Sequence, residues 1–166
     1  GGVYLNLFQC LQDLTWLSVA RTKITDAGMV EIGHLEKLTL LDLYYAPLTD
    51  EGLNQLDRLT NLTELNLWMV PVTDAGLKPL RTLEKLHTLD LRGTKITNAG
   101  LKELAPLQNL KELNLSFTSI TDEGLKDLGA LKNLAHLEFY SCKITLAGVK
   151  EFRELKNLTH SELSFT

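Results

Sequence analysis

A column of acidic residues is the first feature of this sequence that could do chemistry. Asp42, Asp90, Glu138 and Glu162 recur at one fixed interval or at twice that interval, with Asn66 and Asn114 between them. If each lies on its own strand of a parallel sheet, alternate strands place the carboxylates roughly 9–10 Å apart. That is too wide to share a metal ion, but it suits a ribbon of negative potential that attracts a basic peptide. A merely solvated polar face is equally well supported.

Large apolar side chains accompany these acids at outward-facing positions. Tyr44, Tyr45, Trp68 and Met69 belong to adjacent units and are expected to form one patch. Tyr and Trp dominate binding hot spots, so we favour a contact surface over stacking that only stabilises the sheet. The candidate partner-binding residues are Tyr44, Tyr45, Trp68, Met69, Arg92, Phe117, Tyr140, Asp42, Asp90 and Glu138.

Catalytic and metal-binding groups follow no recognisable arrangement. The four histidines, which form no cluster, are His34, His87, His136 and His160. His136 is expected beside Glu112 and Glu138, where ordinary hydrogen bonding is favoured over a titrating site. No serine has a histidine at a spacing that predicts a catalytic pair. We therefore expect no enzyme activity, no metal site and no cofactor.

An internal repeat of constant length positions these side chains. Leu17, Leu41, Leu65, Leu89, Leu113 and Leu137 form one evenly spaced series, and Gly28, Gly52, Gly76, Gly100, Gly124 and Gly148 form another with the same spacing. A fixed period of this kind indicates a solenoid. We divide the single domain into a partial unit at 1–14, six units at 15–38, 39–62, 63–86, 87–110, 111–134 and 135–158, and a truncated seventh strand at 159–166.

Within each unit the apolar period changes. Leu65 and Leu67 alternate with polar neighbours, as in a strand. Leu77, Leu80 and Leu83 then recur every third residue, which is typical of a short α- or 3₁₀-helix. Stacking such units pairs the strands in parallel and places the helices on the opposite side.

A Thr-Asp-x-Gly motif separates the strand from the helix. The Thr is expected to cap the helix, and the Asp to complement its dipole. The Gly is expected to allow close approach of helix and sheet. Asn98 and Leu146 replace the Asp in two units, where we expect weaker caps.

The residues of the strand match a known pattern. Leu86, Leu89, Leu91, Thr94 and Ile96 fit L-x-x-L-x-L-x-x-N/C-x-L, and the pattern returns from Leu110 and from Leu134. The sequence resembles the leucine-rich repeat family, in the LxxLxLxxTxITDAGLxxL form of bacterial and F-box-associated repeats. The resemblance implies an α/β solenoid, a right-handed horseshoe arc with a concave parallel β-sheet and short convex helices. It also implies a protein-binding scaffold.

One departure from that family pattern concerns the turn after the strand. Ala46 and Val70 stand where many members carry Asn, and Pro47 and Pro71 follow them. Neither Ala nor Val has a side-chain hydrogen-bonding group, and Pro has no N–H to donate. We therefore expect a different turn in the second and third units.

Bulk properties exclude some partners. The net charge of −4 disfavours nucleic acid, because neutralising phosphates needs clustered Lys and Arg. No apolar run approaches the length that a membrane-spanning helix needs, and the N-terminal residues do not resemble a signal peptide. We therefore expect no membrane span. Cys10 and Cys142 are expected to be free thiols, compatible with the cytoplasm, although the compartment stays open.

The leading hypothesis is a non-enzymatic protein–protein interaction module that binds a protein or peptide, such as a basic one, on its concave face. The alternative is the substrate-recognition part of a larger enzyme or effector, such as a ubiquitin ligase or a host-targeted bacterial protein. Leu163 and Phe165 belong to a strand with no following helix. That end is expected either to continue in a longer protein or to dock end to end onto another copy.

Overall fold

The computed structural model describes residues 11–162, in which seven strands form one open parallel sheet. The strands are β1 (Trp16–Ser18), β2 (Leu40–Asp42), β3 (Glu64–Asn66), β4 (Thr88–Asp90), β5 (Glu112–Asn114), β6 (His136–Glu138) and β7 (His160–Glu162). Their spatial order follows the chain. Every pairing joins equivalent positions of consecutive units, as Leu41 opposite Leu65 illustrates. The interval found in the sequence is therefore the step from strand to strand.

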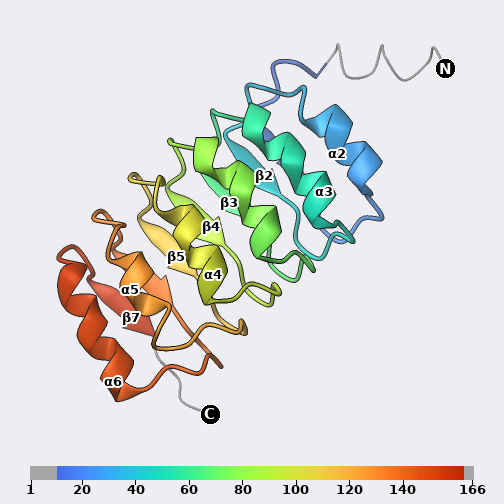
Figure 1. The fold of residues 1–166 in the computed structure, drawn as a ribbon. Helices are drawn as coiled ribbons and strands as arrows, with labels where there is room; N and C mark the ends of the chain where they lie inside the picture. Colours follow the sequence, from blue (N-terminus) through green and yellow to red (C-terminus); the bar gives the residue numbers. More distant parts are fainter. Residues whose placement is uncertain (1–10, 163–166) are drawn as a thin grey trace.

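Short helices cover one side of this sheet (Figure 1). The α-helices are α2 (Asp26–Ile32), α3 (Asp50–Leu53), α4 (Asn98–Leu101), α5 (Leu125–Leu128) and α6 (Leu146–Val149); the 3₁₀-helices are η1 (Asn54–Arg58), η2 (Asp74–Thr82), η3 (Lys102–Leu104) and η4 (Lys150–Glu154). In the unit with Pro79 the helix is entirely 3₁₀. The predicted solenoid is confirmed: a concave parallel sheet with short helices on the convex side.

The core lies between the sheet and the helices. Leu41 and Leu43 of the second unit point inward and are fully buried, while the side chains between and after them face outward. Leu53, Leu56 and Leu59 meet them from the helix side. One layer of this kind follows another, so each unit covers the apolar surface of its neighbour.

The Thr-Asp-x-Gly motif turns out to join consecutive units. The Asp26 carboxylate accepts hydrogen bonds from the Thr49 backbone N–H at 3.0 Å and from its hydroxyl at 2.7 Å, a pair of bonds that we call the clamp. A Cβ on Gly52 would lie 2.3 Å from Asp26 Oδ1. The glycine therefore makes room for the carboxylate of the preceding unit. In the first unit, a Cβ on Gly28 would instead lie 2.7 Å from the Ile24 side chain, which follows β1, so the expected close approach of helix and sheet is only part of the reason for these glycines.

The threonine caps form even where the Asp is replaced. Thr97 and Thr145, beside Asn98 and Leu146, accept from the N–H two residues later at 3.3 and 3.1 Å. Thr49 and Thr73 make the same bond at 3.2 and 3.3 Å. The geometry of the threonine cap is thus kept in those two units, while their first turns carry no acid to complement the helix dipole. That their caps are weaker stays a prediction.

The turn that ends the strand differs in units two and three, as predicted. Leu48 and Val72 donate their N–H to the Ala46 and Val70 carbonyls at 2.9 and 2.8 Å, across the intervening proline, and the other described units lack this bond. Ala46 and Val70 each donate their N–H to the carbonyl three residues back, at 3.0 Å. A second difference lies at the residue after Ala46 and Val70, because Pro47 and Pro71 have no N–H to donate. The equivalent Lys95 donates to Val72 of the preceding unit at 2.8 Å. The prediction of a different turn in these two units is therefore confirmed, and the prolines also remove an inter-unit bond.

Two further expectations concern single features. Cys142 is buried, and its Sγ donates to the Leu115 carbonyl at 3.1 Å. Cys10, Leu163 and Phe165 lie outside the described residues. Between residues 11 and 162 no helix has the length and hydrophobicity needed to cross a bilayer.

Candidate functional site

The concave surface divides into two zones. We call the outward side chains of β1–β7 the floor. The segments that begin two positions after β1–β6 we call the rim: residues 20–24, 44–48, 68–72, 92–96, 116–120 and 140–144. Asp42, Asp90 and Glu138 lie on the floor, whereas Tyr44, Tyr45, Trp68, Met69, Arg92, Phe117 and Tyr140 lie on the rim. The structure thus separates the predicted acids from the predicted aromatics.

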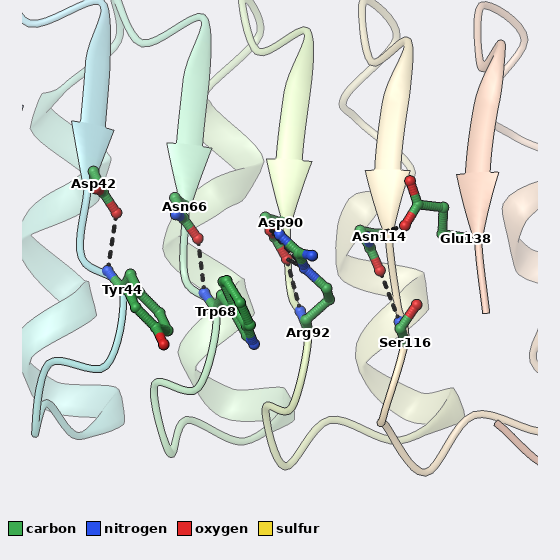
Figure 2. Close-up of polar contacts among 9 residues, drawn as sticks. All are labelled: Asp42, Tyr44, Asn66, Trp68, Asp90, Arg92, Asn114, Ser116 and Glu138. Carbon is green, nitrogen blue, oxygen red and sulfur yellow. Dashed lines mark hydrogen bonds and ion pairs between the residues drawn. The ribbon is translucent and has the colours of Figure 1, made fainter. Parts of the chain in front are cut away.

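The acidic column has a structural role that sequence reasoning missed. Asp42 Oδ1 accepts from the N–H of Tyr44 at 3.0 Å, and Asp90 Oδ1 accepts from Arg92 at 3.0 Å. Asn66 and Asn114 make the same bond to the residue two positions later (Figure 2). A short Asp or Asn side chain that bonds to its own backbone in this way ends the strand. The alternation of Asp and Asn in the sequence was the available signal.

Glu138 is the exception, because its side chain is longer. It accepts from the Asn114 amide instead (Figure 2). The Tyr140 N–H, which has no Asp or Asn two residues before it, donates instead to the hydroxyl of buried Ser116 at 3.0 Å. The Tyr140 hydroxyl donates to the Glu162 carboxylate, which raises the pKa of Tyr140.

Most of the predicted acids are therefore engaged within the molecule. Asp42 also accepts from the Ser18 hydroxyl at 2.9 Å, and Asp90 forms an ion pair with Arg92 at 2.5 Å. That hydrogen-bonded carboxylate raises the pKa of Arg92. Glu64 and Glu112 are exposed and have no hydrogen-bond or ion-pair partner in the described part of the chain. Their carboxylates are therefore free to meet a partner, although we did not predict them as site residues.

The floor is hollowed in two places. A hollow of about 340 Å³ is lined by Trp16, Leu40, Asp42, Glu64, Asn66 and Asp90. The next, of about 220 Å³, includes Glu112 and His136. His136 lines this second hollow together with Glu112 and Glu138, as expected, but no hydrogen bond joins it to either carboxylate in the described residues. Its ring stacks on that of His160 with centroids 5.1 Å apart. No three potential metal ligands come together anywhere in residues 11–162.

Tyr44 and Trp68 form the centre of a stacked row. Their ring centroids are 4.4 Å apart at an interplanar angle of 26°. The Arg92 guanidinium lies 4.1 Å from the Trp68 ring centroid, and Arg21 lies 5.1 Å from that of Tyr44. Both rings are half-buried, so this part of the patch matches the alternative of cross-strand stacking.

The next residue in each unit is different. Tyr45, Met69 and Phe117 are 58%, 45% and 61% exposed. All three have φ near +58°, the left-handed region, as do Arg21, Gly93 and Ser141. These residues are the exposed remainder of the predicted patch, together with Tyr140.

Comparisons with known proteins agree with this architecture. The family model for leucine-rich repeats matches residues 82–105 and 107–129. An internalin (inlF) from Listeria monocytogenes aligns with 94% of the chain at a TM-score of 0.67 and 23% identity, and the chain spans about half (49%) of that protein. Internalin C2 from the same organism aligns with 94% of the chain at a TM-score of 0.55 and 23% identity, over 84% of its own length. No curated protein matches the sequence.

Proposed function

Because this chain is built from leucine-rich repeats, we propose that it is a protein-interaction module whose concave surface binds a protein or peptide. The observation that carries the proposal is a sheet whose outer face is uncovered, with large apolar side chains exposed on the rim beside it. Tyr45, Met69 and Phe117 add little to the core, and exposed apolar patches of this kind mark contact surfaces. The role is one of binding and involves no catalysis.

Charge supports a basic segment as the group that meets the floor. Glu64 and Glu112 lie two strands apart, on β3 and β5, and both face outward. Their carboxylates are separated by roughly 10 Å at ordinary strand spacing. Trp16 stands exposed at the edge of the larger hollow, where an aromatic face favours a cationic side chain.

Inverting the floor charges tests this function. We would compare the wild type, a Glu64→Arg/Glu112→Arg floor variant and a Glu31→Arg/Glu84→Arg control in affinity capture from lysate. Glu31 and Glu84 are exposed and lie outside the floor and the rim. The expected result is a protein retained by the wild type and the control but lost from the floor variant. Identical capture by all three would show that the floor is not the binding surface.

Self-association stays a second proposal for the partner. β7 pairs only with β6 among the described strands, and the edge of a strand can pair with another chain. Light scattering over a range of concentrations would show a dimer if another copy docks there, and a constant monomer mass would remove the idea. The alternative of a recognition part within a larger enzyme or effector remains a prediction.

A further inference from the structure

The rim has a composition unlike the rest of the chain. Its six segments contain five cationic residues, Arg21, Lys23, Arg92, Lys95 and Lys143, and no Asp or Glu. In the whole chain acidic residues outnumber Lys and Arg by 21 to 17. Arg92 is neutralised by Asp90, whereas the other four cations are exposed and form no ion pair in the described structure. The rim is therefore positively charged beside a negatively charged floor.

Apolar side chains lie between these cations. Tyr45 and Met69 are exposed, and so are Pro47 and Pro71 two residues after them. Tyr45 and Met69 belong to consecutive units, and the Tyr45 N–H donates to the Trp68 carbonyl of the next unit at 2.9 Å. Lys23 belongs to the unit before this apolar stretch and Lys95 to the unit after it. The result is an apolar centre with a positive charge at each end.

The fold does not require bulk at these positions. A residue with a Cβ in the left-handed region costs roughly 1–2 kcal/mol. Glycine fits without that cost, as Gly93 does in the fourth unit at φ +63°. Met69 lies over this glycine, since a Cβ there would be 2.5 Å from the Met69 sulfur. Strained, exposed and apolar residues that neither the turn nor the core needs indicate a functional surface.

We propose that the rim binds an extended segment of a partner protein that combines apolar side chains with carboxylates. The apolar side chains of the partner segment pack on Tyr45, Pro47, Met69 and Pro71. Its carboxylates pair with Lys23 at one end and with Lys95 at the other. This inference rests on the proposed function and adds a second zone to it, of opposite charge to the floor. The carboxylates Glu64 and Glu112 repel an acidic segment from the floor and so keep it on the rim.

The distance between Lys23 and Lys95 predicts how far apart the two acidic residues of the partner segment are. Lys23 and Lys95 are three units apart, which is about 14 Å at a strand separation of about 4.8 Å. An extended chain rises about 3.3 Å per residue, so the two acidic residues are roughly four or five positions apart. A nucleic acid fits less well, because it places a charge at every nucleotide and would lie against the acidic floor.

Panning a phage-displayed library of random dodecapeptides on the folded protein tests the proposal. We expect enriched peptides with two acidic residues four or five positions apart and apolar residues between them. Fluorescence anisotropy of a synthetic enriched peptide should show binding at least about tenfold weaker for Lys23→Glu/Lys95→Glu and for Met69→Gly. The charge-matched Lys102→Glu/Lys126→Glu variant, on the helix side, should bind like the wild type.

Other outcomes overturn the inference in distinguishable ways. Enriched peptides that are basic, and that lose binding only with Glu64→Arg/Glu112→Arg, would leave the proposed function standing without the rim site. The absence of any enriched peptide would count against both. A fluorescein-labelled dT20 oligonucleotide that binds more tightly than the peptide, and depends on Lys23 and Lys95, would assign the rim to nucleic acid and overturn the proposal.

Discussion

Asn98 donates its side-chain amide to the hydroxyl of Thr121 at 2.8 Å, reversing the hydrogen bond that an aspartate makes at this place in the other units. At the equivalent place Asp74 accepts from the Thr97 hydroxyl at 2.7 Å. The Thr97 oxygen is then free to accept from the Ala99 N–H at 3.3 Å. No such bond is found for Thr121, and helix α5 begins only at Leu125.

Replacing Asn98 with aspartate should therefore stabilise the protein. The carboxylate would accept from both the N–H and the hydroxyl of Thr121, and charged hydrogen bonds are about twice as strong as neutral ones. We expect the free energy of unfolding in urea to rise by about 1 kcal/mol. Asn54→Asp adds the same charge at an exposed side chain and should have little effect. A loss of stability in Asn98→Asp would show that the clamp does not need an acceptor there.

The clamp should make stability depend on pH through Asp122. Hydrogen bonds from the hydroxyl and N–H of Thr145, at 2.6 and 2.7 Å, lower the pKa of Asp122 below its usual value. A depressed pKa in the folded state stabilises the fold above the unfolded value, near 3.9, and that contribution is lost as pH falls through the folded pKa. Asp122→Asn should therefore be less stable than the wild type at pH 7, and the difference should shrink as the pH falls below about 4.

Urea midpoints at pH 7, 5 and 3 would measure this difference. Glu51→Gln is the control, because Glu51 is exposed and its carboxylate has no partner in the described residues. A gap between the wild type and Asp122→Asn that stays constant down to pH 3 would contradict the assignment.

A double-mutant cycle can isolate the fit between glycine and carboxylate. A Cβ on Gly76 would lie 2.5 Å from Asp50 Oδ1, so Gly76→Ala should lower the free energy of unfolding by about 2 kcal/mol. Asp50→Ala removes the clamp to Thr73, but it also removes the carboxylate with which the Cβ of Gly76→Ala would clash. The double variant should then lose less than the sum of the single losses, by about 1 kcal/mol. Strict additivity, measured in urea, would show that the two residues do not interact.

The period of the sequence predicted the fold because it is a local signal that recurs in every unit. Strand alternation, the spacing of leucines in the helix and the constant repeat length all give the same answer, and the register Leu41 to Leu65 follows from them. The clamp was missed for the opposite reason. Asp26 and Thr49 belong to different units, so no pattern within one unit reveals the bond between them.

The candidate site was only partly predictable. Alternation identified which residues face outward, and Tyr45 and Met69 are indeed exposed. It could not show that Asp42 and Asp90 are held by their own backbone, since an Asp that ends a strand and an Asp that binds a ligand look alike in sequence. Nor could it separate Trp68, half-buried in a stack, from the exposed residue beside it.

That last distinction gives a stability test of the rim. Tyr45→Gly removes an exposed ring from a left-handed position, so the free energy of unfolding should stay unchanged or rise by up to about 1 kcal/mol. Trp68→Ala removes a ring stacked between Tyr44 and Arg92 and should lower it by about 2 kcal/mol. Both are measured by urea denaturation. If Tyr45→Gly cost as much as Trp68→Ala, the Tyr45 ring would belong to the packing of the fold, and its strain would no longer indicate a contact surface.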